Sequence, residues 1–179
     1  MTHLQYVNFF SEIKQDLIAN GWDNKKLGTA LRLLFLGLGV QLLLCYRIQV
    51  RLLSIPIIGR FLSRFVSYFA QVLTGCQISS TAVLQGGINF PHPNGIVIGE
   101  NVIVESGTAI YQQVTLGLDK SGNYPAIGAG VTIFPGAKIF GGICLGDYST
   151  VGANAVVIAD VAAGSVVAGV PAREIKKHV

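Results

Sequence analysis

A single histidine inside the chain is the residue best suited to acid–base chemistry. His92 lies in the segment PHPNG, residues 91–95, whereas His3 and His178 lie next to the chain ends. An imidazole changes its charge close to neutral pH, so it can take a proton from a reacting hydroxyl group. His92 is therefore the candidate general base. The alternative is a histidine that merely fills a corner of the fold.

The three cysteines, Cys45, Cys76 and Cys144, do not form the pattern of a disulfide framework or a metal site. They are odd in number, widely spaced and include no CxxC pair. Such spacing indicates three buried thiols in a reducing compartment, so a cytoplasmic protein is expected. The chain has no thiol pair and only three histidines, which are far apart in the sequence. We therefore expect no metal cofactor.

Aliphatic residues recur at every sixth position in the second part of the chain. They are Ile98, Val104, Ile110 and Leu116, then Ile127, Ile133, Ile139, Leu145, Val151 and Val157. A second row of apolar or small residues follows four positions after them. A period of six scatters residues around an α-helix, but it suits a parallel β-helix in which three short units close one triangular turn. The sequence predicts such a β-helix over residues 76–179, with the aliphatic row as its core.

The six-residue period is broken at two places. The early register leads to Ile96, yet the later register starts at Ile98, so two extra residues must bulge out in the histidine segment. Five further residues are extra between Leu116 and Ile127, and they must leave the coil as a loop, residues 118–126. A regular coil accepts insertions where they project outward, and such loops usually carry function.

The first part of the chain, residues 1–75, is expected to be helical and basic. It carries eight Lys and Arg against three acidic residues, whereas the rest carries five against six. Helices are expected over residues 4–19, 27–53 and about 59–73. The uninterrupted apolar run, residues 33–40, is far shorter than the ~20 residues of a spanning helix, and the N-terminal segment lacks the apolar stretch of a signal peptide.

Two surroundings fit the apolar segment 27–75. It could be buried in an interface between copies of the chain, which is the interpretation we favour, or it could lie on a membrane surface. No basic stripe with interleaved aromatic residues is present, so nucleic acid is not an expected partner.

Three motifs, HPNGIVIGE, YQQVTLG and AGVPAR, stand at the first break, before the loop and in the tail. With the repeat, they make residues 60–176 resemble the serine acetyltransferase family of hexapeptide-repeat acyltransferases. The resemblance implies a left-handed parallel β-helix preceded by helices, a homotrimer or a hexamer, and acetyl-CoA as co-substrate. The expected reaction is transfer of an acetyl group to an acceptor hydroxyl, with His92 as the base.

The resemblance also assigns roles to further residues. Glu100 is the candidate to orient His92, although a solvent-facing carboxylate is an equal alternative. Backbone N–H groups at glycine-rich turns such as Gly117 could stabilise the oxyanion. Acetyl-CoA would lie between two neighbouring coils and contact Gly117, Ala129, Ala137, Lys138, Ala172 and Arg173. Lys176 and Lys177 could also reach its phosphates, unless they are solvated terminal charges.

The acceptor half of the site departs from the family pattern. Gln77 and Pro91 stand where the family carries aspartates, and Asn123 and Tyr124 stand where it carries an Arg-His pair. These family residues hold the ammonium and carboxylate of serine. We therefore expect Pro91, Asn123 and Tyr124 to contact a saccharide acceptor, as in capsule or exopolysaccharide modification, with the enzyme at the inner face of a membrane. The alternatives are a serine O-acetyltransferase of cysteine biosynthesis and an inactive β-helix scaffold.

Overall fold

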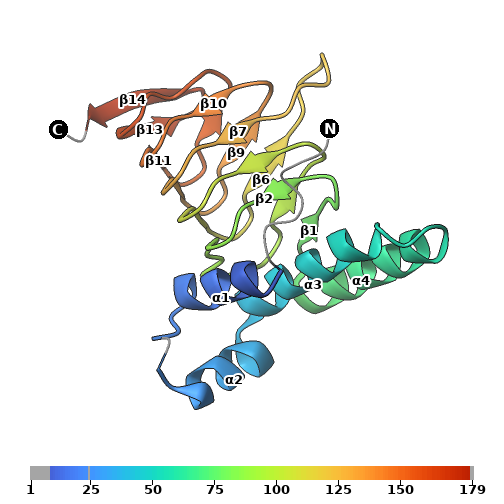
Figure 1. Cartoon of the computed structure of the whole chain (residues 1–179). Coiled ribbons are helices and arrows are strands. Elements are labelled where there is room, and N and C mark those ends of the chain that lie inside the picture. The colour runs from blue at the N-terminus through green and yellow to red at the C-terminus, as the bar shows by residue number, and fades with distance from the viewer. Residues whose placement is uncertain (1–8, 24, 178–179) are drawn as a thin grey trace.

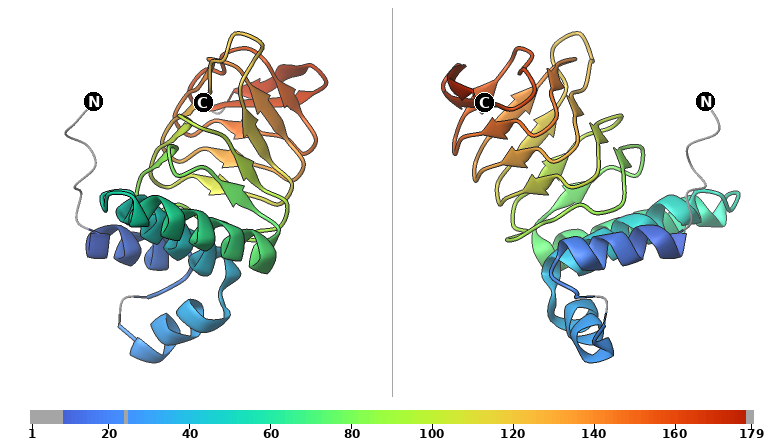
Figure 2. Two further views of the ribbon diagram at one scale, coloured as in Figure 1. Left: turned by 90° about the vertical axis from the view of Figure 1, so that its right-hand side faces the viewer. Right: turned by 60° about the vertical axis from the view of Figure 1, so that its left-hand side comes forward.

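The chain folds into a layer of helices beneath a triangular coil of short strands (Figure 1). The computed structural model describes residues 9–23 and 25–177, so residues 4–8 of the first expected helix and the two terminal histidines lie outside it. The helices are α1 (Phe9–Ala19), α2 (Leu27–Leu36), α3 (Leu38–Leu52) and α4 (Ile58–Thr74). In all views α1, α3 and α4 lie against the first turn of the coil, and α2 lies on the far side of that layer (Figure 2).

Three sheets form the sides of the coil, and their strands are almost all parallel. One side has the order β1-β3-β6-β9-β12, the second β10-β7-β4-β2 and the third β14-β13-β11-β8-β5, with β13 and β14 antiparallel. The strands are β1 (Gln77–Ile78), β2 (Val83–Leu84), β3 (Val97–Ile98), β4 (Ile103–Val104), β5 (Ala109–Ile110), β6 (Thr115–Gly117), β7 (Ala126–Ile127), β8 (Thr132–Ile133), β9 (Lys138–Phe140), β10 (Cys144–Leu145), β11 (Thr150–Val151), β12 (Val156–Val157), β13 (Ser165–Gly169) and β14 (Ala172–Lys177).

The aliphatic row predicted from the sequence forms the core of the coil. Each of its ten residues is the second residue of a strand, and none is more than 2% exposed. They stack in register along each side, as in the column of Ile98, Leu116, Ile139 and Val157. Burying one such side chain contributes roughly 1.5–3 kcal/mol. The predicted parallel β-helix with N-terminal helices is confirmed.

Both breaks in the period lie where the sequence places them. Ile78 pairs with Ile98 and Ile98 pairs with Leu116, so the turn that contains the histidine segment is two residues longer than the next. Leu116 then pairs with Ile139, five residues further on than a regular turn requires. The extra residues of this turn leave the coil between β6 and β7.

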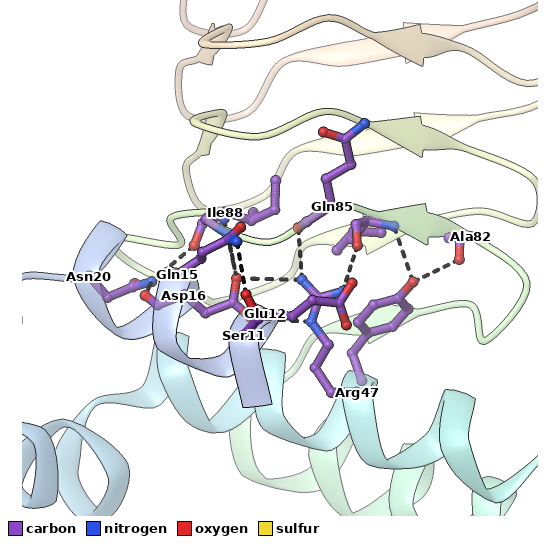
Figure 3. Close-up of polar contacts among 12 residues, drawn as sticks. Ser11, Glu12, Gln15, Asp16, Asn20, Arg47, Ala82, Gln85 and Ile88 are labelled. Carbon is purple, nitrogen blue, oxygen red and sulfur yellow. Dashed lines mark hydrogen bonds and ion pairs between the residues drawn. The ribbon is translucent and has the colours of Figure 1, made fainter. Parts of the chain in front are cut away.

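A buried ion pair joins the helices to the first turn of the coil (Figure 3). The Arg47 guanidinium on α3 donates to the carboxylate of Asp16 on α1, with 3.2 Å between Nε and Oδ2, and to the backbone carbonyls of Leu84 and Gln85. Asp16 in turn accepts a 2.8 Å hydrogen bond from the N–H of Gly87. The polar groups at this junction therefore satisfy one another, which a buried charge requires.

One expectation about the cysteines is wrong. Cys76 is buried and Cys45 is half-buried, but Cys144 is exposed, because it is the first and outward-facing residue of β10. None of the three is in a disulfide. Within the described residues, no His, Cys, Asp or Glu side chains gather in a group of three that could hold a metal ion.

In the described part of the chain, no single helix has both the length and the apolar character to cross a membrane. Helices α2 and α3 together reach that length and composition, but the pair is bent by 79° where they meet. Helix α3 also supplies Leu42, Leu43 and Tyr46 to the core beneath the coil.

Candidate active site

His92 lies on the edge of the coil between the β5 side and the β6 side. We call this the histidine edge and define it by residues 91–95, 111–113 and 134–136. The His92 side chain is exposed, whereas its neighbour Pro93 is buried and anchors the bulge. The N–H of Gln113, one turn further along, donates to the carbonyl of Asn94 at 2.8 Å. The insertion therefore displays the imidazole on a bulge whose backbone is fixed.

Two aromatic rings continue the histidine edge beyond His92. The ring of Tyr111 lies 6.2 Å from the imidazole, centroid to centroid, and the ring of Phe134 stacks on Tyr111 at 5.4 Å. Neither residue was given a role from the sequence, although Tyr111 opens the YQQVTLG motif. Their proximity could have been predicted, because each aromatic residue directly follows a core residue of the same column, Ile110 or Ile133.

The histidine segment forms one wall of a cavity of about 540 Å³. The opposite wall is the junction of α2 and α3, where Gly39 comes so close to the carbonyl of Phe90 that a Cβ atom would lie 2.4 Å from it. None of the described residues that line this cavity is Asp, Glu, Lys or Arg; they are Asn20, Leu33, Leu36, Gly37, Leu38, Gly39, Val40, Asn89, Phe90, Pro91, His92, Pro93 and Asn94. Pro91, predicted to contact the acceptor, thus lines the same cavity as His92.

Glu100 and Tyr124 lie on a different edge from His92. This loop edge, residues 99–101 and 118–125, joins the β3 side to the β4 side. Both residues line a second cavity of about 460 Å³, together with Gln77 and Arg64. Within one chain, therefore, the structure does not bring Glu100, Gln77 or Tyr124 to the cavity of His92.

The loop that carries Asn123 is ordered by its own hydrogen bonds. Asp119 accepts the backbone N–H groups of Ser121 at 2.8 Å and of Asn123 at 3.1 Å. The bond from the Asn123 N–H is the main cause that holds the pKa of the Asp119 carboxyl below its ordinary value. At the base of the loop, the side chain of Asn123 packs over Gly142, where a Cβ atom would be 2.8 Å away. The turn thereby fixes the start of the Asn123-Tyr124 segment.

The predicted coenzyme-binding residues are spread over several faces of the coil. Gly117 and Lys138 lie on the β6–β9 side, and the Lys138 ammonium donates to the carbonyl of Gln113 on the histidine edge. Ala129 lies on the third edge, where its N–H donates to Asp147 at 2.9 Å. The Ala137 side chain is fully buried in the coil, so the predicted coenzyme contact at this position would be made by its backbone.

The C-terminal hairpin holds the last of these candidates. Ala172 and Arg173 open β14 and line a cavity of about 210 Å³ with the β12–β13 segment. The Arg173 side chain is exposed, and its guanidinium donates to the carbonyl of Ala172 at 3.0 Å. The side chains of Lys176 and Lys177 lie outside the described part of the structure.

A coil of six-residue units with an exposed histidine on a bulged edge is the arrangement expected of a hexapeptide-repeat acyltransferase. No protein-family model matches the chain. A serine acetyltransferase of Helicobacter pylori is 37% identical over 142 residues, which span 78% of this chain and 82% of the relative. The chain belongs to the serine acetyltransferase family, and it is an acetyl-CoA-dependent O-acetyltransferase.

The solved structures agree with this assignment over nearly the whole chain. A serine acetyltransferase in complex with cysteine is 33% identical, with a TM-score of 0.83 over 95% of this chain and 66% of its own length. A serine acetyltransferase in complex with CoA is 31% identical, with a TM-score of 0.83 over 93% of this chain and 70% of its own. The chain thus spans about two thirds of the length of these structures.

Proposed function

We propose that His92 is the general base that activates the acceptor hydroxyl. The observation that carries this proposal is the exposed imidazole on a bulge that the coil would not otherwise contain. The hydroxyl oxygen attacks the thioester carbonyl of acetyl-CoA while His92 takes its proton. The thiolate of CoA then leaves and receives that proton from the imidazolium, so His92 ends in its starting state.

L-serine is the acceptor that the relatives support. The curated relatives and the solved structures reported above are named serine acetyltransferases. This favours the alternative of our sequence analysis over the saccharide that we expected. In this proposal the acceptor pocket binds serine with neutral residues. Gln77 and Pro91 replace the family's aspartates, and Asn123 and Tyr124 replace its Arg-His pair.

A saccharide acceptor remains a second candidate because of one specific observation. No charged side chain lines the described wall of the His92 cavity, whereas serine brings an ammonium and a carboxylate whose hydration must be replaced. The rings of Tyr111 and Phe134 beside His92 offer flat apolar surfaces, on which sugar C–H groups can pack. These features suit an uncharged, hydroxyl-rich acceptor.

We further propose that the working enzyme is a homotrimer, or a hexamer built from two trimers. His92 and Tyr124 lie on different edges of one coil, so a site that uses both needs two copies side by side. The free cysteines support a reducing, cytoplasmic setting for this assembly.

The acceptor is tested by measuring CoA thiol release from acetyl-CoA with L-serine and with a panel of mono- and oligosaccharides. Saturable turnover of L-serine at sub-millimolar concentration would establish the first candidate and exclude the second. Turnover of a saccharide with weak or no turnover of L-serine would reverse that order. No release with any acceptor, from protein of native fold, would contradict the proposed activity and support the inactive scaffold.

A further inference from the structure

Helix α4 presents its small residues to the protein and its large apolar residues to the outside. Its buried residues are Gly59, Ser63, Ala70 and Thr74. At Gly59 the approach to α3 is so close that a Cβ atom would lie 1.9 Å from the carbonyl of Leu52. A surface helix ordinarily turns its apolar stripe toward the core. In α4 the opposite face carries that stripe.

The exposed side chains of α4 form one continuous apolar flank. Phe61 is 73% exposed, Phe65 62%, Phe69 54% and Val72 68%. Residues three and four positions apart are neighbours on a helix surface, so these four side chains lie in a row. We call them, with Ile58 and Leu62, the α4 flank. Monomeric proteins rarely expose so many large apolar side chains together, so this flank is a candidate contact surface.

The loop before α4 extends the apolar surface. Leu53, Ile55, Ile57 and Ile58 are 40%, 46%, 86% and 63% exposed, and together with Ser54 and Pro56 they form the tip of the α3–α4 hairpin, residues 53–58. The tip projects beyond the coil in Figure 1 and in the right-hand view of Figure 2. An apolar loop in this position can insert into an apolar medium while the coil stays in water.

Cations predominate around this apolar surface. From residue 24 to residue 99 the sequence contains seven Lys and Arg but no Asp or Glu. Arg60 and Arg64 are exposed one turn apart on α4, and Arg51 is exposed before the hairpin tip. Arg47, in contrast, is buried in its ion pair with Asp16. Glu12 lies within electrostatic range of Arg51, and Glu100 lines a cavity together with Arg64. Cations still outnumber acidic residues here, and such an excess is complementary to an anionic surface.

We propose that the α4 flank and the hairpin tip dock the enzyme on the surface of an anionic lipid bilayer. The aromatic and aliphatic side chains enter the boundary between headgroups and acyl chains, and the arginines pair with lipid phosphates. The helices lie on the bilayer and do not cross it. The charge pattern favours this occupant over a second copy of the chain, since residues 24–75 carry seven Lys and Arg and no acidic residue, and a second copy would present the same basic helices.

The test is flotation of the full chain with vesicles of phosphatidylcholine, alone or with about one third phosphatidylglycerol. We expect binding to the anionic vesicles, weakened by salt. The double variant Phe61→Ser/Phe65→Ser should lose it. Arg60→Gln should weaken binding by about fivefold, the effect of one surface charge. The matched control is Gln71→Ser, an exposed uncharged residue of α4 outside the α4 flank, which should bind as the wild type does.

Two further measurements keep loss of folding apart from loss of docking. The apolar double variant should retain the circular dichroism melting curve and the vesicle-free CoA release of the wild type. Failure of the wild-type chain to float with either kind of vesicle would overturn the proposal. A fall in molar mass of Phe61→Ser/Phe65→Ser, by light scattering, would overturn it as well and assign the flank to a second copy of the chain.

Discussion

The imidazole of His92 makes no contribution to the core, because it stands exposed on its bulge. We therefore expect His92→Asn to leave the fold and the molar mass unchanged. Turnover should fall by about 10²–10⁴-fold, the usual share of general-base catalysis. Steady-state CoA release and a melting curve check this together. A variant that keeps nearly the full rate would remove His92 from the mechanism.

Tyr111 is the side chain whose effect depends on which acceptor is used. If a sugar packs on its ring, Tyr111→Leu should raise the KM for that saccharide by about 2–10-fold, the usual value of an aromatic stacking contact. The kcat should change little, because the ring does not exchange protons with the substrate. Tyr68→Leu, an exposed ring on α4, serves as the control. An unchanged KM would place the saccharide away from the histidine edge.

Ala137 and Glu100 show which properties of single residues the six-residue period can predict and which it cannot. Ala137 belongs to the second apolar row, four positions after Ile133, so its burial was predictable from the pattern that located the core. Glu100 follows His92 by eight positions, while one side of the coil takes about six residues. It therefore reaches the next edge. What faces His92 from a neighbouring copy is not encoded in the period of one chain.

At the scale of elements, the Arg47–Asp16 pair is expected to be the most sensitive point of the helix layer. Removing one member of a buried ion pair leaves the other charged and unpaired, which costs about 3–5 kcal/mol. Arg47→Met should lower the free energy of unfolding by that amount in urea titrations. Adding Asp16→Asn to this variant should restore part of the loss. Equal effects of the single and double variants would show that the carboxylate plays no part.

The same pair gives the helix layer a pH dependence with a defined sign. Burial raises the pKa of Asp16 above its ordinary value of 3.8, although Arg47 pulls the pKa in the opposite direction. The folded protein thus holds the Asp16 proton more tightly than the unfolded chain does. The resulting stabilisation is complete below the ordinary pKa and is lost as the pH rises through the folded pKa. Asp16→Asn should remove this part of the stability profile.

Asp119 is expected to order the loop without stabilising the fold. Asp119→Ala removes the acceptor of the Ser121 and Asn123 N–H groups, so these amides should exchange hydrogen faster. The urea midpoint should stay unchanged, because the loop lies outside the coil. The pKa of Asp119 is lower in the folded protein than in the unfolded chain. The turn that its carboxylate holds is therefore fully formed above the ordinary pKa, and it is lost as the pH falls through the pKa of the folded protein. Unchanged exchange at Ser121 would assign the order of the loop to other contacts.

The elements differ in how well the sequence predicts them. The coil follows from its period because every sixth side chain must enter the same core, and both insertions were visible as shifts of register. Helix α4 was predicted as a helix, but its orientation was not. Because a surface helix usually turns its apolar side chains toward the core, Phe61 and Phe65 would be expected to face inward. Instead Gly59 and Ser63 are buried, because α3 and α4 approach too closely for large side chains.

At the scale of the whole molecule, one chain holds an incomplete set of the predicted site residues. His92 and Pro91 line one cavity, while Glu100 and Tyr124 line another on a different edge. In a closed ring of three coils, the histidine edge of one copy can face the loop edge of the next. Each site would then take its base from one chain and its loop from another.

This arrangement predicts that two inactive variants can restore activity to each other. His92→Asn lacks the base and Tyr124→Ala lacks the loop contact, so homotrimers of either variant should be slow with the acceptor. When the two are unfolded, mixed in equal amounts and refolded together, about one quarter of the shared sites receive both intact residues by random assembly. CoA release should then rise toward one quarter of the wild-type rate. Separately refolded samples combined afterwards are the control, and a mixture no faster than that control would place His92 and Tyr124 in the site of a single chain.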